Sequence, residues 1–518
     1  MAPHLMRGGR TCCFMSGKEQ SITDADFDAH TGPRRATTTS KGAIQLAVPA
    51  SDEGPPQGVS AEDIAALAAG VTGEVLRPGD GGYAAECATF NLAITHKPAV
   101  VVGAAEPADV QAAVRFATAH GLAVAVLATG HQAIVPADGA VLITTRRMSG
   151  ITVDEASHRA VVQAGATAQQ VVDAAEPFGL APIVGSSPSV GVVGFTLGGG
   201  LSPTFGRPFG WAADYVHAIE VVTADGLLRR ATAQEEPELF WALRGSRSNM
   251  GVVTALELDL HDVTRLYGGG LFFSGEDTAS VMHAYQRFTA SVPEELTSSI
   301  ALLRLADAPS VPKLLRGTFT LHVRIAYLGT TAEGERLLAP LRQAAPVLLD
   351  TVGDMPLTDF ASIHQDPADP MLFREWTTML DQFSPETVDA IVELAGPRAD
   401  QPVEYVEVRH LGGALGRRTG PPSAVGNRDA TFAVWLMNLG PPTEGDPQQA
   451  YAQRVLERVQ PWSTGHTYLN FTSSDPTPAR VRQAYSPETY TRLRAAKSVY
   501  DPGNVFRLNQ NIPPGGDA

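Results

Sequence analysis

The amino-acid sequence predicts an α+β protein of two domains, and three observations support this fold class. The chain has 518 residues, which is too long for one compact core. Between residues 98 and 260, short apolar strands alternate with helices. After residue 261, longer strands are interleaved with amphipathic helices, a pattern typical of an antiparallel sheet covered by helices. Two domains of this kind imply a cleft between them.

The second of these observations depends on a strand, a helix and a strand in succession. An apolar strand at 99–102 precedes a helix that begins at Pro107 and ends at Gly121, and a second apolar strand occupies 122–127. The other elements expected in this part are strands at 141–145, around Val161 and at 252–260, a helix at 168–178 and a hairpin turn at Asp225-Gly226.

Ordered structure is expected to begin close to residue 59. Residues 1–58 are rich in Gly, Ser, Thr, Pro and charge and show no helical or strand period, so they are expected to form a disordered leader. Ser60 and Asp63 then form a capping-box pattern ahead of an apolar helical face. We therefore divide the rest of the chain at 59–262, 263–460 and 461–518.

The middle segment carries the longer strands. They are expected at 299–305, 318–327, 404–410 and 432–439, with helices at 331–345 and 386–394. The last segment has its own helix at 487–497, with a turn signal after it at 501–504.

Composition and charge exclude several classes of function. The net charge of −16 and the absence of a dense Lys/Arg stripe exclude nucleic acid as a partner. Apolar stretches such as 122–128 are far shorter than the roughly 20 residues that span a membrane, and no signal peptide is recognisable, so we expect a cytoplasmic protein. Cys12, Cys13 and Cys87 cannot build a disulfide framework, and the histidines lack metal-ligand spacing, so we expect no metal.

Two segments carry the chemistry. Thr129-Gly130-His131-Gln132 comes after an apolar strand, and small residues there let a ligand approach bare backbone N–H groups. The run 191–200 contains five glycines, which is typical of a surface for a flat or anionic ligand. Pro203 and Gly206 would interrupt a long helix after this run, so a Rossmann nicotinamide site is disfavoured. A turn histidine and a glycine-rich loop between strands remain the structural alternatives.

These segments, with three others in a fixed order, resemble the vanillyl-alcohol-oxidase-type flavoproteins, and within them the berberine-bridge-enzyme-like oxidases. The resemblance extends from about residue 75 to residue 513. Its five blocks are 107–117, 129–131, the run 191–200 closed by Arg207 and Asp214, 244–254, and the tail with 468–471 and 501–513.

The resemblance implies a PCMH-type FAD-binding fold. Residues 59–262 and 461–518 together would form the FAD domain, and the substrate domain at 263–460 would be inserted between them. The family joins the equivalent of His131 to the 8α carbon of the flavin. The other residues that the resemblance assigns to FAD are Thr129, Gly130, Gln132, Ser186, Ser187, Gly191, Gly194, Gly198, Gly199, Asn249, Gly251, Val253, Tyr468 and Asn470.

Two departures from the family pattern affect the chemistry. Many members carry a second tether, a cysteine, where this chain has Ser187, and a hydroxyl cannot supply the thiolate that such a bond needs. We therefore expect one covalent link, through His131 only. Several members also have a tyrosine as catalytic base where this chain has Phe471, which cannot accept a proton.

Other groups must then accept the substrate proton. Tyr468 and Glu407 are the preferred candidates. The alternatives are Glu404, Tyr405, His410, a water polarised by Arg409, or no strong base. Alternation along 405–409 places Glu407 and Arg409 on one face of a strand, and this face either is solvated or covers the flavin ring.

The sequence thus predicts an FAD-dependent oxidase of a small organic molecule, with O2 as the electron acceptor. The resemblance favours a role in bacterial natural-product tailoring and a monomer or homodimer. The alternative is a non-redox cyclase, dehydratase or isomerase that keeps FAD. A binding protein without flavin is a third hypothesis, which would make the two glycine-containing segments relics.

Overall fold

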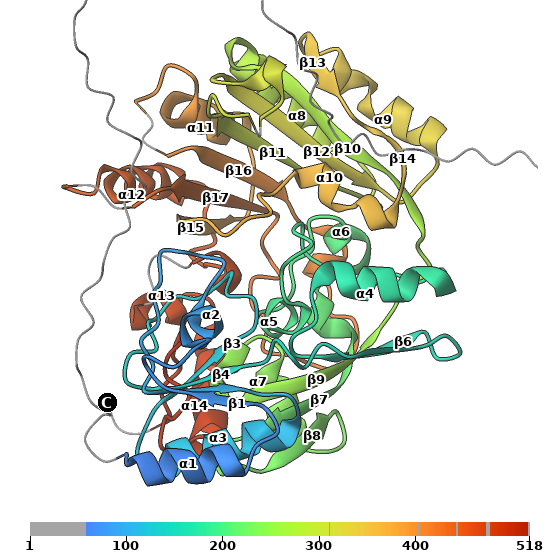
Figure 1. The fold of residues 1–518 in the computed structure, drawn as a ribbon. Coiled ribbons are helices and arrows are strands. Elements are labelled where there is room, and N and C mark those ends of the chain that lie inside the picture. Colours follow the sequence, from blue (N-terminus) through green and yellow to red (C-terminus); the bar gives the residue numbers. More distant parts are fainter. Residues whose placement is uncertain (1–58, 310, 401–402, 442–443, 473–476, 516–518) are drawn as a thin grey trace, which may run out of the picture. The chain divides into compact units, whose positions relative to one another are not determined.

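The structure, a computed structural model, describes residues 59–309, 311–400, 403–441, 444–472 and 477–515. The predicted leader 1–58 lies outside the described residues. Within the described part, the strands form sheets of four, five and eight strands, and helices lie between and over them (Figure 1). The fold is therefore of the α+β class that the sequence predicts.

The four-stranded sheet contains the predicted strand–helix–strand unit. Its order is β1 (Glu74–Leu76), β2 (Val100–Gly103), β4 (Val141–Thr144), β3 (Val124–Leu127). Strands β2 and β3 both run parallel to β4, which lies between them, and helix α3 (Pro107–Ala119) connects them. Helix α1 (Ala61–Ala69) begins at the predicted capping box of Ser60 and Asp63, and α2 (Tyr83–Cys87) comes after β1. The loop that follows β3 of this sheet contains His131.

The five-stranded sheet is antiparallel throughout. Its order is β5 (Ile151–Asp154), β6 (Arg159–Gln163), β9 (Val252–Asp259), β7 (Val216–Val222), β8 (Leu228–Thr232). The predicted hairpin is confirmed, since Asp225 and Gly226 connect β7 to β8 and Gly226 has φ +73°. The helices of this part are α4 (Ala168–Ala175), α5 (Val192–Leu197), α6 (Gly206–Phe209) and α7 (Pro237–Leu243). Helix α5 is a short helix inside the glycine run, and its residues Val192, Val193, Thr196 and Leu197 are buried.

The eight-stranded sheet forms the other half. Its strands are β10 (Arg265–Ser274), β11 (Leu296–Arg304), β12 (Phe319–Tyr327), β13 (Val347–Asp350), β14 (Gly353–Pro356), β15 (Phe373–Leu380), β16 (Tyr405–His410) and β17 (Phe432–Leu439). Their order is β13-β10-β12-β11-β16-β17-β15, with β14 also paired to β10, and all these pairs are antiparallel. The short helix α10 (Ala361–His364) precedes β15.

The two faces of this sheet differ in character. Apolar residues of one face pack against helices α8 (Thr278–Thr289), α9 (Thr331–Arg342), α11 (Pro385–Ala395) and α12 (Pro447–Val459) (Figure 1). On β16 this face carries Val406 and Val408, whereas Tyr405, Glu407 and Arg409 lie on the opposite face because side chains alternate along a strand. The opposite face is buried as well, so the expectation of a solvated face for Glu407 and Arg409 is wrong.

The C-terminal segment returns to the first part of the chain through α13 (Pro478–Arg482) and α14 (Pro487–Tyr500). The buried Lys497 Nζ donates to the carbonyl oxygen of Asn249 at 2.7 Å and pairs with Asp501 at 2.6 Å. The backbone N–H of Val124 bonds to the carbonyl oxygen of Val505 at 3.0 Å. All described residues belong to one contact unit, so the boundaries at 262/263 and 460/461 stay predictions. No helix in the described part has the length and apolar character that a bilayer crossing requires.

Candidate active site

A cavity of about 310 Å³ lies where the three sheets and the tail meet. One wall comes from β3 and the loop after it, a second from the glycine run and the segment that contains Arg247, and a third from β15, β16 and β17. The tail closes it with Asn470, Phe471, Leu508 and Asn509. Residues far apart in the sequence therefore build one site.

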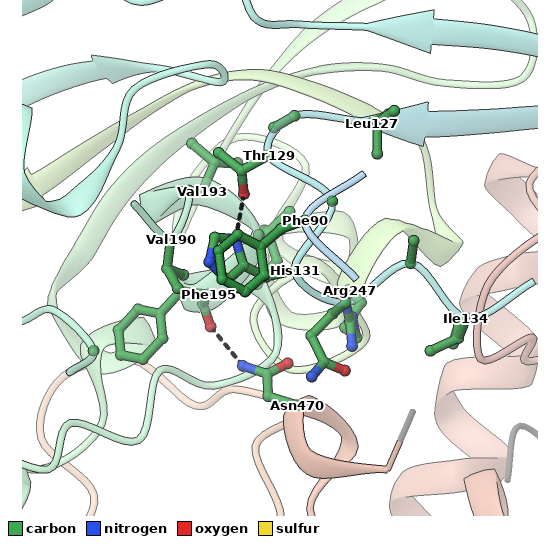
Figure 2. A pocket seen from close by; sticks show the side chains of 18 of the residues that line it. Phe90, Leu127, Thr129, His131, Ile134, Val190, Val193, Phe195, Arg247 and Asn470 are labelled. Carbon is green, nitrogen blue, oxygen red and sulfur yellow. Dashed lines mark hydrogen bonds between the residues drawn. The ribbon is translucent and has the colours of Figure 1, made fainter. Parts of the chain in front are cut away.

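His131 lies in the wall of this cavity with its ring held on both edges (Figure 2). Its Nδ1 is 3.0 Å from Thr129 Oγ1, and its Nε2 is 3.2 Å from Ser189 Oγ. The ring of Phe90 stacks on the imidazole, with centroids 3.8 Å apart. Burial lowers the pKa of His131 to about 4, so the imidazole is neutral at pH 7 and keeps a lone pair.

Most of the residues assigned to FAD line this cavity. They are Thr129, Gly130, His131, Gln132, Ser186, Ser187, Gly191, Gly194, Gly251, Val253 and Asn470. Gly198, Gly199, Asn249 and Tyr468 do not line it.

The residues outside the cavity wall have identifiable structural roles. A Cβ on Gly198 would collide with Asn470, so this glycine makes room for the asparagine. Gly199 has φ +112° and packs against Trp211. Asn249 Oδ1 accepts from the backbone N–H of Ile512 at 2.8 Å, and its Nδ2 donates to the carbonyl oxygen of Gln510 at 3.0 Å. Asn249 therefore fastens the tail, and its polar atoms bind the backbone of the protein.

Unused polar atoms and bare backbone in the cavity fit a flavin. Asn470 Nδ2 donates to the carbonyl oxygen of Phe195 at 3.0 Å, while the buried Asn470 Oδ1 and Gln132 Oε1 have no hydrogen-bond partner among the described residues (Figure 2). A Cβ on Gly194 would meet no atom within 4 Å and would project into open space beside the cavity. Because buried polar groups are normally satisfied, a bound group that supplies hydrogen-bond donors would complete these two acceptors.

Tyr468 lies behind the cavity wall rather than in it. Its hydroxyl accepts hydrogen bonds from the backbone N–H of Leu201 and from Asn470 Nδ2, both at 3.0 Å. Burial raises the pKa of Tyr468 to about 12. A phenol in this position orients Asn470, and the placement does not favour the predicted role of catalytic base.

Glu407 is the centre of a buried ionic cluster. Its Oε2 accepts from Arg409 Nε at 2.8 Å and from Tyr405 Oη at 3.0 Å, and its Oε1 accepts from Arg324 Nη1 at 3.0 Å. Burial alone would raise the pKa of Glu407, but Arg409 and Arg324 hold it well below its usual range. Glu407 does not line the cavity, whereas Arg409 does. Its placement likewise favours a positioning role over that of a base.

The other candidate bases also lie outside the cavity wall. Glu404 accepts a hydrogen bond from the backbone N–H of Leu439, and His410 Nε2 lies 2.9 Å from Arg207 Nη1 on the opposite face of β16. Burial lowers the pKa of His410 to about 3. Burial also raises the pKa of Tyr405 above its usual range, despite the opposing effect of Arg324.

Sequence reasoning missed several cavity residues, of which Glu375 matters most. Glu375 lies on β15, is buried, and accepts hydrogen bonds from Gln132 Nε2 and from Trp435 Nε1, the latter at 3.0 Å. The strand was not predicted, so no face could be assigned to this carboxylate. Arg247 was also missed, and it lines the cavity with a backbone φ of +59°, a conformation that a non-glycine residue rarely adopts.

Known proteins share both parts of this site. The model of the FAD binding domain matches residues 98–232, and the model described as berberine and berberine like matches residues 467–513. (R)-6-hydroxynicotine oxidase of Paenarthrobacter nicotinovorans is 28% identical over 467 residues, which cover 86% of this chain and 98% of that enzyme. An uncharacterised FAD-linked oxidoreductase of Bacillus subtilis is 25% identical over 457 residues, covering 86% of this chain and 98% of the relative.

Solved structures are also similar to this chain. The crystal structure of 6-hydroxy-D-nicotine oxidase from Arthrobacter nicotinovorans superposes with a TM-score of 0.76 at 25% identity, covering 86% of this chain and 98% of that one. A xylooligosaccharide oxidase from Myceliophthora thermophila superposes with a TM-score of 0.75 at 21% identity, covering 88% and 100%, and shows the same fold. Fold and site together define an FAD-linked oxidoreductase. The chain contains the FAD binding domain and the berberine-like segment, and its relatives and structural neighbours are berberine-bridge-enzyme-like, PCMH-type FAD oxidases.

Proposed function

We propose that this enzyme carries FAD bound covalently through His131 alone and uses it to oxidise a small organic molecule, with O2 as the final electron acceptor. The observation that carries the proposal is the position of His131 in the cavity wall, where Thr129 and Ser189 hold its imidazole. A protonated ring has no lone pair to bond with carbon, whereas burial gives His131 a pKa of about 4. Ser187 also lines the cavity, while the described cysteine, Cys87, does not. We therefore expect a single covalent link.

The bound FAD would supply the hydride acceptor and the route for electrons to O2. Thr129 and Ser189 hold the two edges of the His131 ring, and Asn470 and Gln132 each offer a carbonyl oxygen to the flavin. Phe90 stacks on the imidazole and covers one face of it.

Glu375 is the residue best placed to accept a substrate proton. Among the described residues, Asp366 and Glu375 are the carboxylates that line the cavity, and Asp366 is half-exposed. Gln132 and Trp435 fix the carboxylate of Glu375 in orientation. Tyr468 and Glu407 then serve as positioning residues, for Asn470 and Arg409 respectively.

The cytoplasmic location and the role in bacterial natural-product tailoring belong to this proposal as well, and the tailoring role is an analogy with the resembling family. A non-redox reaction remains the rival function. One observation favours it: no tyrosine lines the cavity among the described residues.

Acid precipitation of the purified protein tests the tether. Yellow colour should stay in the pellet of the wild type and move to the supernatant for His131→Ala. Release of flavin from the wild type would refute the covalent link. Anaerobic addition of substrate then separates the two functions, because an oxidase loses its oxidised flavin spectrum and a non-redox enzyme turns over without that loss.

A further inference from the structure

Two arginines share the carboxylate of Glu407, but only one of them, Arg324, donates a hydrogen bond from each of its three side-chain nitrogens. Arg324 donates from Nη1 to Glu407, from Nε to His322 Nδ1 at 3.2 Å, and from Nη2 to the carbonyl oxygen of His364 at 3.4 Å. Arg409 donates only from Nε, to Glu407. Its two terminal amines have no hydrogen-bond partner among the described residues, although its side chain is 7% exposed.

The unused amines of Arg409 lie beside aromatic rings in the cavity. The guanidinium carbon is 4.6 Å from the ring centroid of Phe471 and 5.0 Å from that of Trp435, and these two rings stack on one another. Phe373 also lines the cavity. An aromatic ring of a substrate would find stacking partners here. A guanidinium whose ring contacts and Nε bond fix its orientation presents two parallel N–H groups, the geometry that a carboxylate or phenolate oxygen prefers.

The carboxylates that the structure describes near Arg409 do not accept hydrogen bonds from its terminal amines, so these amines are available to such an anion. Glu407 is already shared with Arg324, and Glu375 accepts hydrogen bonds from Gln132 and Trp435. Asp366 lines the cavity and acts on Arg409 through space, but no ion pair between them occurs among the described contacts. Burying a guanidinium with two open donors is costly unless a ligand supplies the acceptors.

We propose that Arg409 is a specificity-determining residue whose terminal amines bind an anionic oxygen on an aromatic ring of the substrate, as a carboxylate or a phenolate. This inference rests on the proposed function and names the substrate class for the same cavity. Phe471 takes part by leaving the guanidinium free, since a ring without a hydroxyl offers it no oxygen.

Binding of matched probes to the holoenzyme tests the inference by titration calorimetry. Benzoate is compared with benzamide. At a pH above the pKa of its hydroxyl group, 4-cyanophenol is compared with its methyl ether. The wild type should bind at least one anion about tenfold or more tightly than its neutral partner. The first pair reports a carboxylate and the second a phenolate. Equal affinity within both pairs would overturn the inference.

Arg409→Met should reduce the preference to about threefold or less, because the apolar stem is kept and the charge is lost. Arg374→Met is the matched control: Arg374 lies on β15 of the same sheet, does not line the cavity and pairs with Asp446, so the preference should persist. Should Arg409→Met not fold, Arg409→Lys keeps a charge beside Glu407 but loses the planar fork, and the preference for the anion should fall at least about threefold.

The same samples separate this inference from the proposed function. Retained covalent flavin without any preference for anions would refute the role of Arg409 alone, whereas loss of the flavin link in the wild type would refute the proposed function. An anion preference that survives Arg409→Met and disappears in Arg247→Met would place the oxyanion at Arg247 and overturn the proposal.

Discussion

Replacement of Glu407 by glutamine should destabilise the protein more than it slows the chemistry. The carboxylate is fully buried and accepts hydrogen bonds from Arg324, Arg409 and Tyr405. Glutamine removes the charge and turns one acceptor into a donor that faces other donors. Breaking a buried ion pair by removing one partner costs about 3–5 kcal/mol. At about 2.1 cal/mol/K per residue, the unfolding entropy of 518 residues is about 1.1 kcal/mol/K, so the melting temperature should fall by about 3–5 °C.

The pH dependence of this loss has a defined sign. The pKa of Glu407 is lowered in the folded protein, so its stabilisation is complete above the ordinary glutamate pKa of roughly 4.3 and is lost progressively as the pH falls below that value. Thermal unfolding monitored by far-UV circular dichroism should show a constant difference between wild type and Glu407→Gln from pH 6 to 8, and a smaller difference below about pH 4. Arg409→Met is the comparison variant, because it leaves Glu407 paired with Arg324.

A different outcome would refute this reasoning. If Glu407→Gln kept the melting temperature of the wild type and reduced kcat by about a hundredfold or more, Glu407 would be acting as a general base, and the positioning role would be wrong.

Three further predictions concern the walls of the cavity. Tyr468→Phe should keep kcat within about threefold and cost about 1 kcal/mol of stability, measured by denaturant unfolding, because only hydrogen bonds to a hydroxyl outside the cavity are lost; a large loss of kcat would restore Tyr468 as a base. Gly194→Val should reduce the flavin content of the purified protein, measured by absorbance, because its branched side chain would enter the space beside the cavity; full flavin content would contradict this. Asn249→Ala should cost about 2–3 kcal/mol, since buried backbone groups of the tail lose their partners, and limited proteolysis should then cut the tail faster; unchanged proteolysis would refute the fastening role.

The sequence was sufficient to predict the fold class and the first half of the site. Strands 99–102 and 122–127 and the hairpin at Asp225-Gly226 can be predicted from apolar period and turn chemistry, both of which are local. His131 and the glycine run can be predicted from order along the chain, and the structure places most of their residues in one cavity. Strand β10 was missed because it contains Gly268, Gly269 and Gly270, which are unfavourable in a strand except where close neighbours need the space.

The substrate side of the site could not be predicted from local pattern. Whether Glu407 and Arg409 face water or a cavity depends on which sheet face the helices cover, and that is settled only by packing of distant segments. Glu375 lies on β15, a strand that the sequence did not predict, so its place in the site could not be predicted either. Tyr468 and Asn249 were predicted as cofactor residues because they belong to motif blocks. In the structure, their polar atoms form hydrogen bonds with the protein's own backbone.

The order of residues along the chain determines at which stage of synthesis the flavin can bind. The cavity is closed by residues of the tail, namely Asn470, Phe471, Leu508 and Asn509. During synthesis these residues leave the ribosome long after His131 and the glycine run, so the flavin pocket has no closing wall until the tail has emerged. Attachment of the flavin should therefore come after the tail has docked, and chains that lack the tail should be colourless. The ratio of yellow to total protein would then report how many chains have docked their tails, which makes the cofactor an indicator of completed assembly.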